Sequence, residues 1–144
     1  MNLVGQYVVF KLGNELFGVT ISEIREIINK VKISKVPQMP KAMKGITNLR
    51  GKVTAIYDLG EKFGLGERGY LDNSKVIIAN DGEIGFIVDD VKEIIDVTTD
   101  NIESAGSLRF DQLVAGFAKI NDEIITIVNF NALKEQEIFK EITA

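Results

Sequence analysis

The chain has 144 residues and a formal net charge of −4 at pH 7, a length that fits one domain or two very small units sharing a core. The acidic balance repels phosphate backbones and anionic lipids, so neither nucleic-acid binding nor direct membrane insertion is expected. The sequence contains no Cys and no His, which excludes disulfides, thiolate and imidazole catalysis, and most transition-metal sites.

The aliphatic residues favour a mainly β protein. Ile and Val together make up nearly a quarter of the chain, and these β-branched side chains fit a pleated, half-buried surface. No stretch approaches the ~18 consecutive apolar residues of a membrane-spanning helix, and the N-terminus lacks a basic, signal-like region. We therefore expect a cytoplasmic protein that holds no metal and no cofactor.

The first elements are predicted from two β-prone runs, 7–12 and 16–21, which flank a Gly-Asn turn and indicate a hairpin. Ser22 follows this hairpin and is placed to cap a short helical turn over 23–28, because a Ser hydroxyl accepts a bond from the first free N–H groups of a helix. Residues 30–33 are predicted to form another strand.

A second hairpin is predicted further along the chain. Residues 36–40 contain two prolines, which lack the donor that a central strand needs, and so they indicate a loop. After this loop, the runs 45–49 and 52–57 flank an Arg-Gly turn and predict the hairpin. Asp58 is then placed to cap a short helix over 59–63 that ends at a glycine.

The pattern restarts after the glycine-rich stretch 64–74, which is predicted to connect two halves of the chain. The runs 76–79 and 84–88 flank an Asp-Gly turn and match the first hairpin when Gly18 is aligned with Gly85. In this alignment Val9 falls on Val76 and Ser22 falls on Asp89, so that one predicted helix cap meets another.

The second hairpin also recurs, in a separate alignment that places Gly45 on Gly116 and Ile56 on Ile127. A C-terminal helix is predicted after this copy. Its cap is either Asn129, the counterpart of the first copy's Asp58, or Asn131 at the start of a helix over 132–140.

Two matches in the same order predict an internal duplication. Each half has about five short strands, and closing each half into a small barrel removes the exposed edges that an open sheet would present. The approximate halves are residues 1–70 and 71–144 of a single domain, with exchange of strands between them allowed. Two barrels packed together share a core and leave a groove along their junction.

Candidate catalytic and metal-binding motifs are incomplete. Asp89 and Asp90 lack the acidic loop of a calcium site, and such residues usually act as caps. The string G-x-G-x-x-G over 64–69 neither follows a strand nor opens a helix, as a dinucleotide site requires. A small carboxylate-dependent hydrolase or nucleotide-binding enzyme is the alternative function, and no motif supports it.

Arg50 is the candidate binding residue. It lies in the tight turn of the second hairpin, where a solvated side chain is the ordinary interpretation. The second copy has Asn121 and Asp122 in the same place, so the hairpin itself does not require Arg. The guanidinium group is therefore a candidate for a function beside this ordinary interpretation.

Four motifs occur in a fixed order along the chain. A hairpin with a trailing Glu-Ile covers 16–27, and the string G-x-x-N-L-R-G at 45–51 precedes a predicted strand that is followed by Asp-Leu. V-D-x-V occurs at 88–91, and a small glycine hairpin occurs at 116–118. Together these motifs resemble those of the CheW-like domain family of bacterial chemotaxis, and the resemblance covers nearly the whole chain.

This resemblance implies a mainly all-β fold of two small SH3-like five-stranded β-barrels, with short helices and a C-terminal helix. It also implies a non-enzymatic adaptor in membrane-associated signalling arrays. The implied partners are the cytoplasmic tips of chemoreceptors (methyl-accepting chemotaxis proteins) and the regulatory domain of the histidine kinase CheA. The motifs assign no residue to the kinase contact. The family's receptor-binding positions fall on Arg50, Ile24, Glu26, Gly45 and Gly116.

Overall fold

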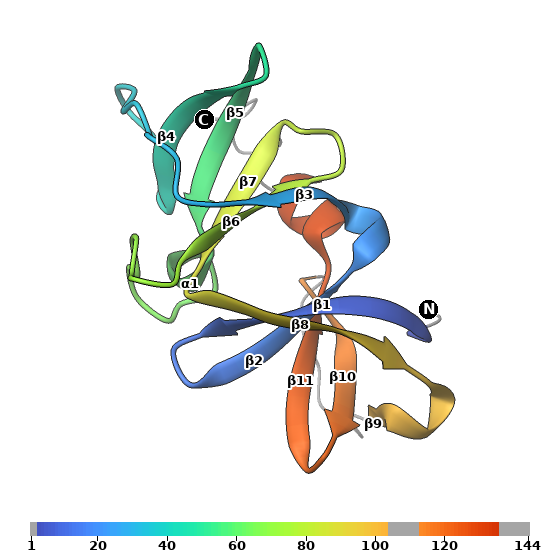
Figure 1. Cartoon of the computed structure of the whole chain (residues 1–144). Helices are drawn as coiled ribbons and strands as arrows, with labels where there is room; N and C mark the ends of the chain where they lie inside the picture. The colour runs from blue at the N-terminus through green and yellow to red at the C-terminus, as the bar shows by residue number, and fades with distance from the viewer. Residues whose placement is uncertain (1–2, 104–112, 136–144) are drawn as a thin grey trace.

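Figure 1 shows a computed structural model of the chain, in which residues 3–103 and 113–135 are described. From the N-terminus the elements are β1 (Gly5–Leu12), β2 (Glu15–Thr20), the 3-10 turn η1 (Ile21–Glu23), β3 (Ile24–Ile28), β4 (Met43–Leu49), β5 (Lys52–Asp58) and the short helix α1 (Leu59–Lys62). They continue with β6 (Lys75–Ala79), β7 (Ile84–Val88), β8 (Asp90–Val97), η2 (Thr99–Asn101), β9 (Ile102–Glu103), β10 (Val114–Ile120) and β11 (Glu123–Val128).

The described strands form two sheets. Sheet A has the strand order β8-β1-β2-β11-β10-β9, and sheet B has the order β3-β6-β7-β5-β4. Each sheet takes strands from both halves of the chain, because β3 crosses over to pair with β6 while β8 crosses back to pair with β1. The predicted mainly β fold with short helices and two SH3-like units is confirmed (Figure 1).

The internal duplication is visible in the pairing registers. Gly18 in β2 lies opposite Ile127 in β11, and Gly85 in β7 lies opposite Ile56 in β5, in the two parallel pairings of the structure. These four positions are the ones that the two sequence alignments match with each other. A Cβ atom at either glycine would lie 3.2 Å or less from an Ile side chain, so both copies need a small residue there for the same reason.

The first strands of the two copies align differently from their sequence match. Val9 pairs with Gly18, whereas Gly85 pairs with Ile78 and not with Val76. The cause is the turn, because β1 and β2 are joined by two residues while β6 and β7 are joined by four. The predicted correspondence of Val9 with Val76 is therefore wrong by two positions, which keeps the same face of the strand.

Two further predictions of local structure are wrong. Residues 24–28 form the edge strand β3 instead of a helical turn, and Ser22 lies in η1, which has no side-chain cap. The residues after Asp89 likewise form β8. Both segments find their hydrogen-bond partners in the other half of the chain, and this non-local pairing outweighs a local cap signal. The predicted strand at 30–33 is irregular, and the backbone just after it pairs with β4 through the bridge from Ser34 to Ile46.

Buried side chains form three clusters that follow the alternation of the strands. One face of sheet A packs on itself around Tyr7 and Val9, and one face of sheet B packs on itself around Val76 and Ile78. The opposite faces meet in a central cluster between the sheets. Because the clusters within a sheet include residues from edge and middle strands alike, each sheet curls around its own small core.

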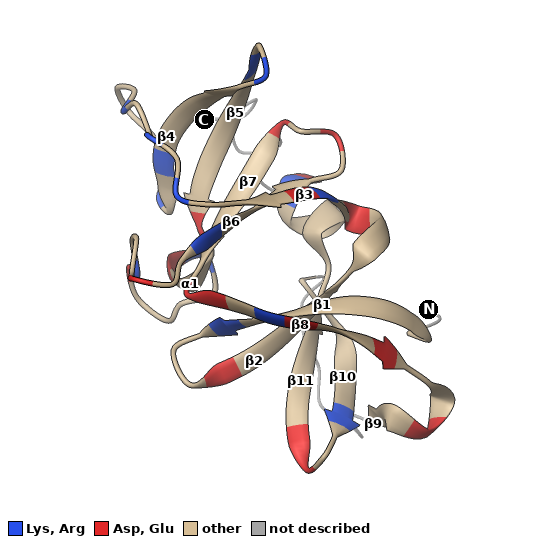
Figure 2. Cartoon of the chain, in the orientation of Figure 1, with Lys and Arg blue, Asp and Glu red and all other residues tan. Residues whose placement is uncertain are grey.

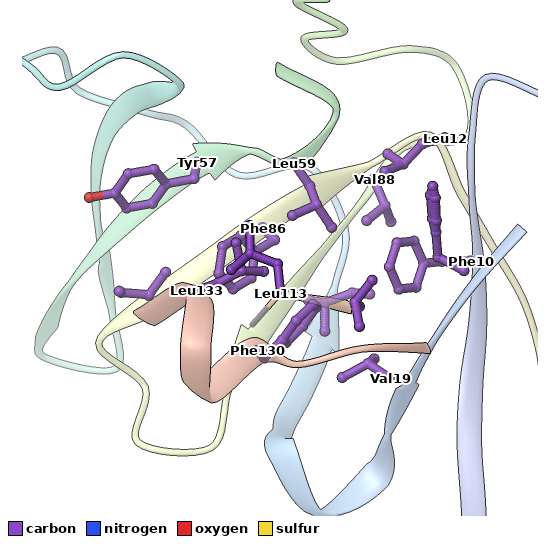
Figure 3. Close-up of a cluster of buried hydrophobic side chains, with 14 of the residues drawn as sticks. Phe10, Leu12, Val19, Tyr57, Leu59, Phe86, Val88, Leu113, Phe130 and Leu133 are labelled. Carbon is purple, nitrogen blue, oxygen red and sulfur yellow. The ribbon is translucent and has the colours of Figure 1, made fainter. Parts of the chain in front are cut away.

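Aromatic rings make up the middle of the central cluster (Figure 3). Phe130 lies between Phe10 of sheet A and Phe86 of sheet B, with ring centroids 6.3 Å and 4.6 Å away. Phe17 and Tyr57 extend the row at its two ends. Such offset and edge contacts add to the burial of the rings, and Phe130 bridges the aromatic rings of the two sheets.

The C-terminal helix begins at Phe130 and is described as far as residue 135. Asn129 caps it, because its Oδ1 accepts the N–H of Ala132 at 3.1 Å. Asp58 caps α1 in the same way by accepting the N–H of Glu61. Of the two sequence alternatives the structure thus selects Asn129, the counterpart of Asp58, and the rest of the predicted helix lies outside the described residues.

Candidate functional site

The turn that carries Arg50 has a geometry that other residues adopt more easily. Arg50 and Gly51 have φ values of 52° and 84°, the left-handed pair of a two-residue hairpin turn. Asn121 and Asp122 in the second copy have φ values of 52° and 67°. Asn and Gly accept this conformation readily, whereas an L-residue such as Arg loses about 1 kcal/mol in it. The turn alone therefore does not account for Arg50.

Arg50 is held by an ion pair. Its Nη1 donates to Oε2 of Glu26, which projects from the edge strand β3, while most of the Arg side chain stays open to solvent (72% exposed). Two neighbouring cations, Arg25 and Lys52, line the same notch. Arg25 lies over the bare backbone of Gly82, where an added Cβ would lie 2.5 Å from its Nη1. Three cations thus surround one carboxylate, and the notch presents a net positive charge to a partner.

Ile24 lies on the other face of β3. It pairs with Ala79 and packs half-buried against the central cluster, whereas Glu26 pairs with Ile78 on the face that belongs to the core of sheet B. A register shift between these two residues lets the edge strand present both sides. The structure therefore places Ile24 and the Arg50–Glu26 pair at one strand edge, but on opposite faces of it.

Gly45 is buried where the segment before β4 crosses that strand. Its φ is +147°, and an added Cβ would overlap the backbone carbonyl of Ser34, which exchanges two hydrogen bonds of 2.8 Å with Ile46. The need for glycine at 45 is thus explained by packing within the chain. Gly116 occupies the equivalent bulge in sheet A, the sheet that does not contain Arg50, and the atoms nearest to an added Cβ there belong to the side chain of Leu3.

The notch at Arg50 has a counterpart in sheet A. Duplicate positions line a second small concavity, where Lys92, Glu93, Asn121 and Glu123 replace Arg25, Glu26, Arg50 and Lys52. The carboxylate at 26 and 93 is kept, while the Arg that holds it and the Lys beside it are exchanged for Asn and Glu. The same backbone site is therefore cationic in sheet B and anionic in sheet A.

Arg68 was not singled out from the sequence, although it fixes the connection between the halves. Its backbone N–H and that of Gly69 donate to Oδ2 of the buried Asp58, both at 2.7 Å. Its guanidinium donates to Asp89 at 2.8 Å, and this pairing raises the pKa of Arg68. Asp89 also accepts the N–H of Gly13 at 2.7 Å. In the sequence, the glycine-rich stretch around Arg68 looks like an ordinary connection. The signals that could have indicated the cluster are Asp58 and Asp89, which lie 10 and 21 residues from Arg68.

Arg25 and Lys52 were likewise missed, because strand residues with outward charges are common and give no signal of their own. Their relevance depends on the pairing of β3 with a strand of the other half, which a local pattern does not reveal.

Among the described residues, no helix is long and apolar enough to cross a membrane.

Comparisons with known proteins agree with this fold. A profile of the CheW-like domain matches residues 6–137. The chemotaxis protein CheW of Klebsiella aerogenes is 30% identical over 140 residues, which cover 93% of this chain and 84% of that protein. CheW of Helicobacter pylori is 31% identical over 140 residues, covering 94% and 82% respectively.

A solved structure is similar as well. The crystal structure of the scaffolding protein TtCheW from Thermoanaerobacter tengcongensis superposes with a TM-score of 0.77 at 35% sequence identity, covering 90% of this chain and 86% of that one. The resemblance inferred from the four motifs is thus confirmed by a match over nearly the whole chain, and the protein belongs to the CheW-like domain family.

Proposed function

We propose that this protein is a non-enzymatic chemotaxis adaptor that couples the cytoplasmic tips of chemoreceptors to the regulatory domain of the histidine kinase CheA. Its relatives are named chemotaxis and scaffolding proteins, which supports the scaffold role. Location in membrane-associated receptor arrays, through these partners, is part of the same proposal. The carboxylate-dependent enzyme considered from the sequence gains no support, because Asp58 and Asp89 are both engaged with backbone and Arg68.

The observation that carries the proposal is the exposed guanidinium of Arg50. It stands in a left-handed turn that the second copy fills with Asn, and Glu26 fixes its direction. A planar guanidinium bonds carboxylates or carbonyls through a fixed fork that Lys cannot reproduce. Since one edge of that fork is bonded to Glu26, its remaining donors are directed outward at low conformational cost.

The proposed receptor contact combines this polar group with an apolar anchor. Receptor tips are helical hairpins in the family, and a helix binds a groove through apolar anchors and a few directed polar bonds. Ile24 and Glu26 were assigned to this contact with Gly45 and Gly116. In our proposal Ile24 contributes from the inter-sheet face, Glu26 orients Arg50, and the two glycines act by shaping their strands.

The test is titration of an Arg50→Asn variant against a receptor-tip fragment and, separately, against the kinase regulatory domain. Asn fits the turn, so the variant removes the guanidinium without straining the backbone. We expect receptor affinity to fall about thirtyfold, which corresponds to about 2 kcal/mol for a largely desolvated bond. Kinase binding is expected to be unchanged.

A Lys119→Ala variant is the matched control, because it removes one exposed cation from sheet A. Its receptor affinity should equal that of the unmodified protein. Equal receptor affinity of the Arg50→Asn variant would make Arg50 an ordinary solvated turn residue. Loss of both partners together would show instead that the variant disturbs the fold.

A further inference from the structure

A groove on sheet B lies at the far end of β4 from Arg50. The irregular segment after β3 forms one wall, and the connection between the halves forms the other. Its apolar lining comes from Val31, Ile33, Met39, Met43, Tyr70 and Ile87. The full length of the extended strand β4, about 20 Å, separates position 43 from position 50, so this groove is distinct from the Arg50 notch.

The charged residues that line the groove are Lys32, Lys35 and Lys44 and one carboxylate, Glu67. The segment 30–44 contains five Lys and no Asp or Glu, in a chain whose net charge is −4. Lys44 is bonded to Glu61 and Glu67 at 3.1 Å and 2.9 Å; burial lowers its pKa, and these two bonds raise it by more. Lys32 and Lys35 line the same groove, are exposed, and make no ion pair with another of the described residues.

The walls of the groove are held by a tyrosine side chain and by the backbone conformation of the loop before β4. Tyr70 both donates to the carbonyl of Val31 at 2.8 Å and accepts its N–H at 3.0 Å, which ties the two walls together. Gln38 and Ala42 have φ values of 55° and 74°, a conformation that non-glycine residues rarely adopt. These strained positions lie on either side of Met39, so the segment is held in the shape that leaves the groove open.

We propose that this groove binds an acidic, amphipathic segment of a partner protein. Apolar side chains of the segment would occupy the lining around Met39 and Met43, and its carboxylates would pair with Lys32 and Lys35. Methionine side chains adapt to different apolar shapes and therefore suit such a contact. This inference does not rest on the adaptor function. The residues that line the groove differ from those assigned to the receptor contact, although both surfaces include residues of β4.

Other anionic ligands fit the groove less well. A compact phosphate group needs a fork of donors or a nest of backbone N–H groups, whereas here separate lysines surround an apolar floor. A flat anionic bilayer would contact the lysines and leave the concave lining empty. A peptide can satisfy both features, since it carries carboxylates and apolar side chains on one short element.

The probe is a short fluorescein-labelled synthetic peptide, long enough for several helical turns, with Glu and Leu on opposite faces of the helix. Its binding to the full chain is measured by fluorescence anisotropy. We expect saturable binding that weakens several-fold between about 50 and 200 mM salt. A Lys32→Glu/Lys35→Glu variant should bind at least about tenfold more weakly, because two attractive pairs become repulsive. A Lys11→Glu/Lys119→Glu variant, with the same net charge changed on sheet A, should bind as the unmodified protein does.

Three outcomes would overturn the proposal. Equal loss in both double variants would mean that only the net charge of the protein matters. Equal binding of a peptide with Ser in place of Leu would mean that the apolar lining is unused. Binding of phosphatidylserine vesicles that depends on Lys32 and Lys35, without peptide binding, would identify a lipid surface instead. Arg50 is intact in all these proteins. Titration of the same variants with the receptor-tip fragment therefore tests the adaptor proposal separately from peptide binding at the groove.

Discussion

Sheets A and B share one backbone plan and differ in charge. Their registers, bulges and inner glycines repeat. Yet residues 21–88, which contain sheet B, carry 11 Lys and Arg against 8 Asp and Glu, a net charge of +3. The described segments that contain sheet A (3–20, 89–103 and 113–135) carry 4 against 10, a net charge of −6 (Figure 2).

This difference distinguishes residues that the fold requires from residues that give each sheet its own surface charge. A feature kept in both copies, such as the glycine at 18 and 85, is explained by packing that both copies share. A feature present in one copy only, such as Arg50 against Asn121, has no cause in the shared backbone. Duplication thus provides an internal control, and substitutions at matched positions can test each assignment.

The largest expected contrast is between the glycines of the two equivalent bulges. Gly45→Ala should lower the free energy of unfolding by about 3 kcal/mol, because the added Cβ meets the carbonyl of Ser34 and φ is unfavourable. Gly116→Ala should lower it by less than about 1 kcal/mol, because Leu3 is flexible and can move aside. Urea unfolding of both variants measures the contrast.

Equal losses at 45 and 116 would contradict the assignment of Gly45 to packing. The result also bears on the receptor contact. If Gly45→Ala unfolds the protein easily, loss of receptor binding in that variant reports stability and says nothing about direct contact.

The second contrast concerns the two helix caps. Asp58→Asn should lower the free energy of unfolding by about 2 kcal/mol. Oδ2 of Asp58 accepts the N–H groups of both Arg68 and Gly69, and an amide NH2 in its place would bring N–H donors against N–H donors. The opposite exchange, Asn129→Asp, should change stability by less than about 1 kcal/mol, because among the described residues the Asn129 side chain accepts one bond, from the helical N–H of Ala132, and a carboxylate can accept it too. Thermal unfolding of the two variants, compared at one pH, gives both values, and a larger loss at 129 would refute the explanation.

A smaller effect is expected from exchanging the turn residues. Arg50→Asn should raise the free energy of unfolding by up to about 1 kcal/mol, because Asn adopts the left-handed conformation more easily. Asn121→Arg should lower it by at most a similar amount, because the new Arg takes up the turn strain while Glu93, the counterpart of Glu26, is available to pair with it. Chemical unfolding of each variant checks the sign. A loss of stability in Arg50→Asn would mean that the ion pair with Glu26 outweighs the turn strain.

The hairpins, the cap at Asp58 and the duplication could be predicted from the sequence because they depend on neighbouring residues. Alternating apolar runs, glycine turns and cap residues report local geometry, and these predictions were confirmed. The strands β3 and β8 were missed as strands because their partners lie in the other half. Ser22 and Asp89 stand before these two segments and indicate helix caps, and the neighbouring residues give no sign of the distant partner strand.

The candidate site shows the same division. Arg50 could be selected because the second copy shows that the turn does not require it. The separation of Ile24 from Glu26 onto opposite faces could not be predicted, because it follows from a register shift within a pairing that the sequence did not reveal. Arg68 was hidden for a related reason, since its partners Asp58 and Asp89 lie 10 and 21 residues away and looked complete as caps.

The smallest expected effect is a pH dependence carried by Glu23. Its carboxylate accepts the N–H of Phe130 at 2.8 Å and so links η1 to the C-terminal helix. Burial raises the pKa of Glu23 above its ordinary value of 4.5, although the bond from Phe130 opposes this shift. A carboxyl group with a raised pKa binds more protons in the folded state, so its contribution to stability is fully present below pH 4.5 and is lost as the pH rises through the raised pKa.

Replacing Glu23 by Gln keeps an oxygen that can accept the Phe130 N–H and removes the buried charge. The Gln variant should therefore be at least as stable as the unmodified protein at pH 7, with the difference between them shrinking toward pH 4. Urea unfolding of both proteins from pH 4 to pH 8 measures this difference and cancels the titration of every other group. A Gln variant that is less stable at pH 7 would mean that the negative charge itself holds the first turn of the helix, through its attraction to the helix N-terminus, and that the bond from Phe130 outweighs the burial of the carboxylate.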